Sequence, residues 1–278
     1  MQKMIDTRRI AFCSFRAAQC PDHRRFSASV DALLGPGWTE LKELSVATKQ
    51  VGATHNQFER YLFLLSLNRS RPLSCEWVDP YFNQEIQAET DAEIAVTAWN
   101  YLMKIYEEIR SLQQDTKDWD NFRGLVQTAM GVVDILRGTD LRGIPMLSRH
   151  RMIDFLDNYN LMALAIYRLV TLGDKKHWIK ANMSISQQAE RALLTVRDLD
   201  NRLQPCFAPL VSFIKCYYEA ASFYIVGFLM RQEGRDDYKN YFGKCLDLLN
   251  RSEQIELQVY APPCLDQFRG VIRMDCTI

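Results

Sequence analysis

The chain has 278 residues, of which 47% are hydrophobic and 24% charged, and its 34 basic and 34 acidic side chains cancel. This composition is ordinary for a soluble globular protein, and the length allows one large hydrophobic core. A neutral chain lacks the broad positive field that nucleic-acid binders use, so we expect no nucleic-acid partner.

The amino-terminal residues 1–37 lack sustained periodicity and are predicted to form an irregular arm. Six Lys or Arg side chains fall within residues 1–30, against Asp6 and Asp22. A basic arm of this kind is typical of a solvated terminal segment, of a segment that contacts anionic lipid or an acidic partner, or of an organelle transit peptide. We favour the solvated segment, with membrane contact that is at most peripheral.

Apolar residues that recur every three or four positions predict a series of helices, separated by Gly, Pro and polar residues. The predicted helices cover 38–51, 54–67, 89–113, 118–137, 152–172, 174–202, 207–232 and 237–257. Residues 68–82 are predicted to be an extended connector, and residues 258–278 an irregular tail that packs back on the helices. Because long helices with short connectors pack antiparallel, the predicted fold is all-α, an irregular antiparallel helical stack.

Two of these helices carry further signals. Thr90-x-x-Glu93 has the spacing of a capping box at the start of its helix. Residues 207–232 are apolar except for Lys215 and Glu219, which stand four apart on one helix face and can pair there. Since charged side chains are costly at the centre of a bilayer, we predict a buried central helix here and no membrane span.

The cysteines indicate a reducing compartment. The chain has eight of them, none in a Cys-x-x-Cys pair and none preceded by a secretory signal, so we predict reduced thiols in a cytoplasmic protein. Cys13, Cys20 and His23 have ligand types that suit zinc, but three candidates at this spacing do not make a zinc site. We predict no metal and no cofactor.

No catalytic signature is present. The four histidines do not form a His-Glu-x-x-His pattern, and the sequence contains no nucleophile elbow, Walker loop or dinucleotide fingerprint. We therefore predict no catalytic residues, although an all-α enzyme with a site assembled from distant residues stays open as an alternative. A binding surface is the better hypothesis. The spacings of four apolar residues suit either a groove floor or the core: Leu169, Trp178, Ile179 and Ile185. Trp178 follows a polar helix start, where a large aromatic is often half exposed.

Several segments, taken in order, resemble one known family. Residues 73–82, with Trp77 and Asp79, resemble the "Trp-x-Asp-x-Phe" connector of Bro-type domains, known from Alix and its relatives, and a long helix follows as it does there. The similarity extends over residues 40–260. The other similar segments are 58–62, 185–189, 216–220 with Tyr224, and 241–246.

This resemblance implies a banana-shaped, single-domain scaffold over residues 1–278 with a tetratricopeptide-like core and no enzymatic activity. Bro-type domains bind the carboxy-terminal amphipathic helix of ESCRT-III subunits in endosomal sorting, so it implies a monomeric adaptor, cytoplasmic and associated with endosomes, for such a partner helix. The groove would include Leu169, Ile185 and Leu246, together with Trp178. Asn182 departs from the family, which has an apolar groove residue there. The alternative is a structural helical subunit of another assembly.

Overall fold

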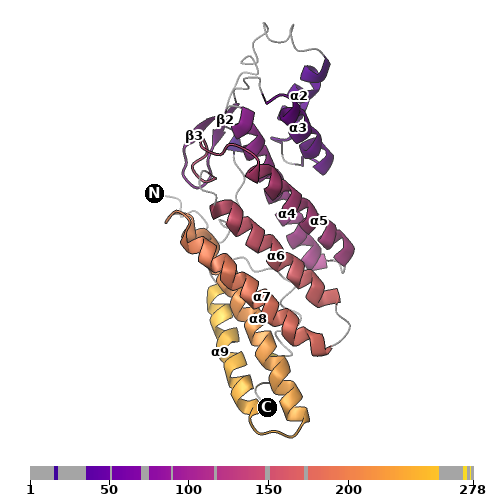
Figure 1. Cartoon of the computed structure of the whole chain (residues 1–278), viewed down its shortest axis with the longest axis vertical. Coiled ribbons are helices and arrows are strands. Elements are labelled where there is room, and N and C mark those ends of the chain that lie inside the picture. The colour runs from indigo at the N-terminus through magenta and orange to yellow at the C-terminus, as the bar shows by residue number, and fades with distance from the viewer. Residues whose placement is uncertain are drawn as a thin grey trace. The chain divides into compact units, whose positions relative to one another are not determined.

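The computed structural model describes residues 16–17, 36–50, 52–69, 75–88, 90–115, 118–147, 151–171, 175–256, 272–273 and 276. Within these residues the chain forms eight helices and three short strands, and the predicted all-α architecture is confirmed (Figure 1). The chain divides into two compact units, which we describe separately. The N-terminal unit comprises 13–106 and 129–153, and the C-terminal unit includes 107–128 and 154–278.

Helices and a small sheet make up the N-terminal unit. Its elements are β1 (Arg16–Ala17), α2 (Pro36–Ala47), α3 (His55–Leu67), β2 (Cys75–Val78), β3 (Glu85–Ala88), the first part of α4 (Thr90–Asp115) and the last part of α5 (Trp119–Arg137). The starts and ends of α3, α4 and α5 lie within two residues of the predicted ones.

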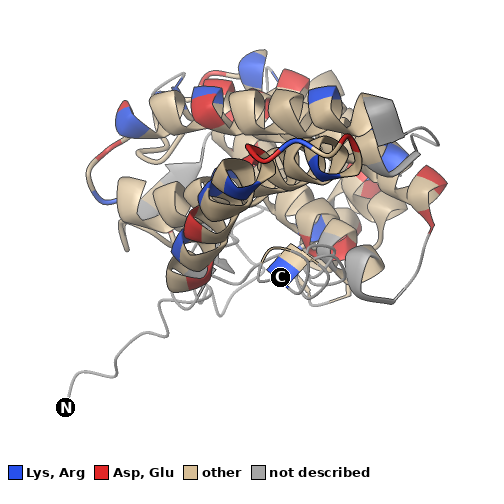
Figure 2. Cartoon of the chain, turned by 90° about the horizontal axis from the view of Figure 1, so that it is seen from below, with Lys and Arg blue, Asp and Glu red and all other residues tan. Residues whose placement is uncertain are grey.

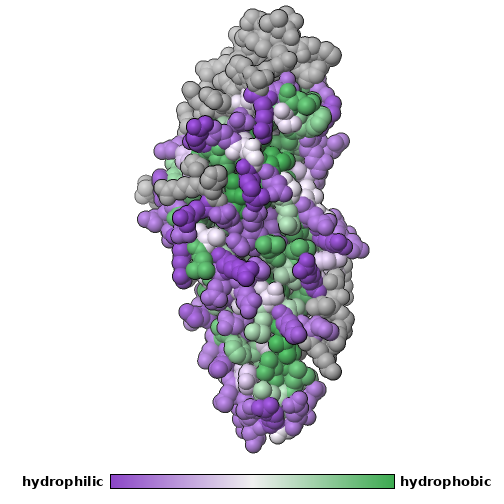
Figure 3. All heavy atoms as spheres, in the orientation of Figure 1, coloured by the Kyte–Doolittle hydropathy of each residue, from purple (hydrophilic) through white to green (hydrophobic). Residues whose placement is uncertain are grey.

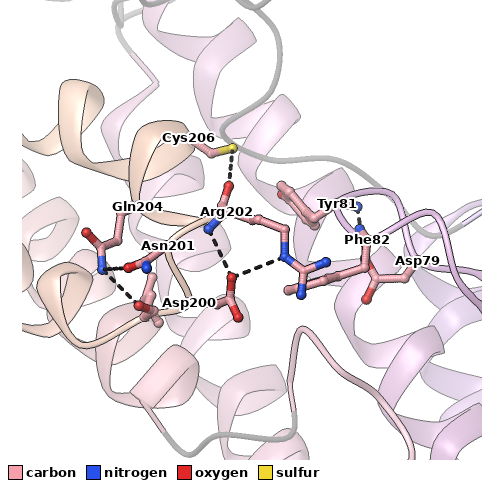
Figure 4. A network of polar contacts seen from close by, with 9 residues as sticks. Asp79, Tyr81, Phe82, Asp200, Asn201, Arg202, Gln204 and Cys206 are labelled. Atoms are coloured by element: carbon pink, nitrogen blue, oxygen red, sulfur yellow. Dashed lines mark hydrogen bonds and ion pairs between the residues drawn. The ribbon is translucent and has the colours of Figure 1, made fainter.

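A three-stranded antiparallel sheet replaces part of the predicted connector and arm. Strand β2 pairs with β1 on one side and with β3 on the other. The turn between β2 and β3 is held by Asp79, whose Oδ1 accepts hydrogen bonds from the backbone N–H groups of Tyr81 and Phe82 at 2.9 and 3.1 Å (Figure 4). The prediction of an extended connector over 68–82 therefore missed a strand, because the pairing partner of β2 lies beyond the connector.

Helix α3 begins with a capping box. The Thr54 hydroxyl accepts a hydrogen bond from the Gln57 N–H at 3.3 Å, and the Gln57 side chain accepts one from the Thr54 N–H at 2.8 Å. These two bonds satisfy backbone donors that the first helical turn otherwise leaves without partners.

We expect Thr54→Ala to lower the free energy of unfolding by about 1 kcal/mol, because the helix loses its cap. The measurement is urea denaturation. The matched control is Thr128→Ala, which removes the hydroxyl of a half-buried threonine bonded to the Gly124 carbonyl inside α5 and should leave stability unchanged or slightly raised. Equal losses in both variants would contradict the capping role.

A buried carboxylate joins three elements of this unit. The side chain of Glu93 on α4 is fully buried. Its Oε1 accepts a hydrogen bond from the Tyr61 hydroxyl of α3 at 2.7 Å, and its Oε2 accepts one from the Trp77 indole N–H of β2 at 2.5 Å. The Lys49 ammonium lies 3.8 Å from Oε1 and over the Trp77 ring. Glu93 thus serves tertiary packing, and the capping role predicted for it is wrong.

In the C-terminal unit, α8 lies between α7 and α9, and both pack against it along their lengths (Figure 1). Phe155 of α6 also contacts Phe207 of α8, with ring centroids 5.0 Å apart. The helices are α6 (Arg151–Thr171), α7 (Lys175–Arg197), α8 (Gln204–Gln232) and α9 (Tyr238–Glu256).

Helix α7 ends five residues earlier than predicted, because side chains of the following turn form hydrogen bonds with backbone groups at and after the end of the helix. The Gln204 side-chain N–H groups donate to the carbonyls of Arg197 and Leu199 at 3.0 and 2.9 Å. Asp200 Oδ1 accepts a hydrogen bond from the Arg202 backbone N–H at 3.0 Å (Figure 4). The turn leads directly into α8, so α7 and α8 run antiparallel.

Aromatic packing closes the α8–α9 pair. The Phe242 ring of α9 is stacked with Tyr224 of α8, at 6.1 Å between centroids and 18° between planes, and lies edge-on to Tyr238. Gly227 faces the same ring. None of the helices in the described part of the chain, α8 included, has both the length and the apolar character that crossing a membrane requires.

Candidate partner-binding surface

The four sequence-predicted contact residues all fall in the C-terminal unit, but they differ in exposure. Leu169 on α6, Trp178 on α7 and Leu246 on α9 are half-buried, whereas Ile185 on α7 is 0% exposed. Helices α7 and α9 each pack on α8, so α8 lies between Leu246 and the two α7 residues. Among the described contacts, none joins any two of the four side chains directly.

Ile185 is a core residue. It shares one buried face of α7 with Ala189, Ala192 and Val196, which follow at intervals of four, seven and eleven residues. Asn182 is also buried, at 3% exposed, and its amide donates to the Trp178 carbonyl of its own helix at 2.7 Å. The departure from the family pattern at Asn182 therefore lies inside the unit, with its donor satisfied locally.

A different face of α7 reaches the surface. Ile179, Met183, Ser186 and Glu190 stand at intervals of four, seven and eleven residues and so share one side of the helix. Met183 is 50% exposed, while Ile179 and Ser186 are half-buried. Glu190 forms an ion pair with Lys215 of α8, with 3.2 Å between Oε1 and Nζ. The pairing of Lys215 with Glu219 that the sequence suggested is thus replaced by a bridge between helices.

That ion pair shows which residues of α7 and α8 lie level with one another. On α8, Lys215 shares a face with Glu219, Ser222 and Val226, again at intervals of four, seven and eleven residues. Since the helices are antiparallel and each rises about 1.5 Å per residue, Ile179 and Val226 come level about 16 Å from the ion pair. We call the strip formed by these two faces the α7–α8 seam.

The α7–α8 seam is polar at one end and apolar at the other. The polar end holds Glu190 and Lys215, and the apolar end holds Ile179, Met183 and Val226. Trp178 stands in the first turn at the same end of α7, and half-buried Leu229 and Met230 continue the Lys215 face of α8. Figure 3 shows hydrophobic residues (green) reaching the surface of the C-terminal unit between hydrophilic ones.

This arrangement suits an amphipathic partner. An apolar strip with charged groups beside it accepts a helix that has one apolar and one charged face. Figure 2 shows basic and acidic residues interspersed along the described helices in that view. Sequence reasoning found Trp178 and Ile179 in this region but missed Met183 and Val226, because which residues of α7 and α8 lie side by side is a tertiary property.

The structure supplies no separate chemical site in its described part. No group of three or more metal-binding side chains occurs there, and Cys206, Cys216, Cys245 and Cys276 are free thiols. Cys13, Cys20 and His23 lie outside the described residues. The motifs that carried the family resemblance have structural roles, since Trp77 binds Glu93 and Tyr224 packs on Phe242.

Comparison with known proteins gives a clear likeness in fold. A solved structure that concerns endosomal targeting by the Bro1 domain superimposes on this chain with a TM-score of 0.69 and 13% sequence identity, over 95% of this chain and 82% of that chain. No protein-family model matches the sequence, and no curated protein does. The likeness shows that this chain has the fold of a Bro1 domain.

Proposed function

We propose that this chain, which has the fold of a Bro1 domain, is a non-enzymatic helical adaptor that binds an amphipathic helix of a partner protein. The observation that carries the proposal is the α7–α8 seam, where Met183 exposes half of an apolar side chain beside Ile179 and Val226. Exposed apolar side chains rimmed by charged ones mark protein interaction sites.

The proposed partner is the carboxy-terminal helix of an ESCRT-III subunit, in the cytoplasm and at endosomes. The fold supports this choice, because the solved Bro1 domain concerns endosomal targeting. Leu169, Trp178 and Leu246 are half-buried and remain proposed contacts. We assign Ile185 to the layer beneath the contact surface because it is fully buried.

The test is binding of a fluorescent peptide with the sequence of an ESCRT-III carboxy-terminal helix, measured by anisotropy. We expect Met183→Asp to weaken binding at least about tenfold, which corresponds to about 1.4 kcal/mol, because a charge replaces an apolar anchor. Met183 suits this test since its exposure lets the variant fold. Ile185→Asp would place a charge in the core and unfold the unit.

The matched control is Leu67→Asp, the same kind of change at a leucine that is 65% exposed on α3 of the other unit. Leu67→Asp should bind the peptide as the wild type does. If both variants bind like the wild type, the seam is not the contact surface. Wild-type protein that neither binds the peptide nor stays monomeric in size-exclusion chromatography would favour a structural subunit of another assembly.

A further inference from the structure

Two cysteines of the C-terminal unit lie near each other at α9. Cys245 lies in the middle of α9 and is 0% exposed, and Cys276 is half-buried, 31 positions further along the chain. The Cys276 side chain lies within interaction distance of the Cys245 thiol. Neither takes part in a disulfide, so the pair is reduced.

Neighbouring residues hold Cys276 in this position. Ile272 is 3% exposed. The Arg273 guanidinium donates to Glu253 Oε2 of α9 at 2.5 Å and to Asn250 Oδ1 at 3.1 Å. The Arg273 contacts therefore hold this part of the chain against α9, independently of the thiols. This docking keeps the second sulfur beside the first, which gives the pair a high effective concentration.

The two thiols differ in accessibility. Burial, together with the neighbouring Cys276 thiol, raises the pKa of Cys245 far above that of an ordinary cysteine. Cys245 thus stays protonated at neutral pH and is not itself the reactive group. Cys276 is the more accessible of the two, so an oxidant meets it first. An accessible thiol beside a resolving thiol is the arrangement of redox-sensitive cysteine pairs.

We propose that Cys245 and Cys276 form a reversible disulfide, which would link Cys276 covalently to α9. With hydrogen peroxide as the oxidant, the Cys276 thiolate attacks one peroxide oxygen, giving a sulfenic acid and releasing hydroxide, which takes up the thiol proton to form water. The Cys245 sulfur then attacks the sulfenic sulfur, the S–S bond forms, and a second water leaves. In sum, two thiols are oxidised, and one peroxide is reduced to two waters.

The test is peptide mapping by mass spectrometry after the full chain is treated with hydrogen peroxide at neutral pH. We expect a peptide pair joined through Cys245 and Cys276, two hydrogen atoms lighter than the reduced pair and separated again by dithiothreitol. Cys276→Ser should leave Cys245 a free thiol under the same treatment. As the matched control, Cys206→Ser removes another half-buried cysteine and should leave the disulfide unchanged.

A second measurement separates docking from chance pairing. The same treatment in 8 M urea should give no preference for this pair among the eight cysteines. Arg273→Ala should slow formation of the disulfide severalfold, because the segment loses its contacts to α9. The proposal fails if native protein forms no Cys245–Cys276 disulfide, or forms it no faster than unfolded protein does.

Discussion

Replacing Glu93 with alanine is expected to lower the free energy of unfolding by about 3–5 kcal/mol. The substitution removes the acceptor for two buried donors at once, the Tyr61 hydroxyl and the Trp77 indole N–H, which are 1% and 2% exposed. A buried donor without a partner costs about 1–3 kcal/mol. The Lys49 ammonium also loses the carboxylate that lies 3.8 Å away.

Urea denaturation of the full chain measures this loss. The matched control is Glu107→Ala, the same substitution at an exposed glutamate on the same helix, which should change stability by no more than about 0.5 kcal/mol. A double-mutant cycle adds a sharper test, since Tyr61→Phe should cost less in the Glu93→Ala background than in the wild type. If the two losses simply add, Glu93 and Tyr61 are not coupled, and the proposed network is refuted.

Glu93 also shows which parts of the fold a sequence can predict. Helices α4 and α5 were predicted to within two residues, because their apolar periodicity and end signals are local. The partners of Glu93 stand 16 and 32 residues away along the chain. Local spacing therefore predicted a cap at Thr90, and only tertiary contacts turn the carboxylate inward. Strand β2 was missed because its four residues are too few to establish an alternation and because its pairing partners lie outside the predicted connector.

The residues of the candidate surface also differ in whether local sequence could predict them. Trp178 was expected to be half exposed because it begins a helix, and it is half-buried. Ile185 was placed in the groove by family resemblance, although its spacing to Ala189, Ala192 and Val196 already favours a core face. Met183 and Val226 were not predicted, because neither helix alone shows which residues of the other lie beside it. The Glu190–Lys215 ion pair reveals that register.

Gly227→Ala is expected to lower the free energy of unfolding by about 1–3 kcal/mol, the cost of overpacking a closed site. A Cβ atom at this position would lie 2.6 Å from the Cδ1 and Cε1 atoms of Phe242 and 3.2 Å from the Cβ of Tyr241. The Phe242 ring has little room to turn, since it is 4% exposed and in contact with the rings of Tyr224 and Tyr238. The two helices must therefore separate to admit the methyl group.

The control for Gly227→Ala is a glycine-to-alanine change that should raise the free energy of unfolding instead of lowering it. Gly131 is exposed within α5, and a Cβ atom there would meet nothing within 4 Å. Gly131→Ala should therefore raise the free energy of unfolding by up to about 1 kcal/mol, the difference in helix propensity between the two residues.

Both variants are measured by urea denaturation. Phe242→Leu should relieve much of the loss caused by Gly227→Ala, because a smaller side chain leaves space for the methyl group. If Gly227→Ala stabilises the chain as Gly131→Ala does, the close approach of α8 to α9 does not depend on glycine. Stabilisation by Gly131→Ala and destabilisation by Gly227→Ala, with rescue at Phe242, would tie the α8–α9 contact to this one missing side chain.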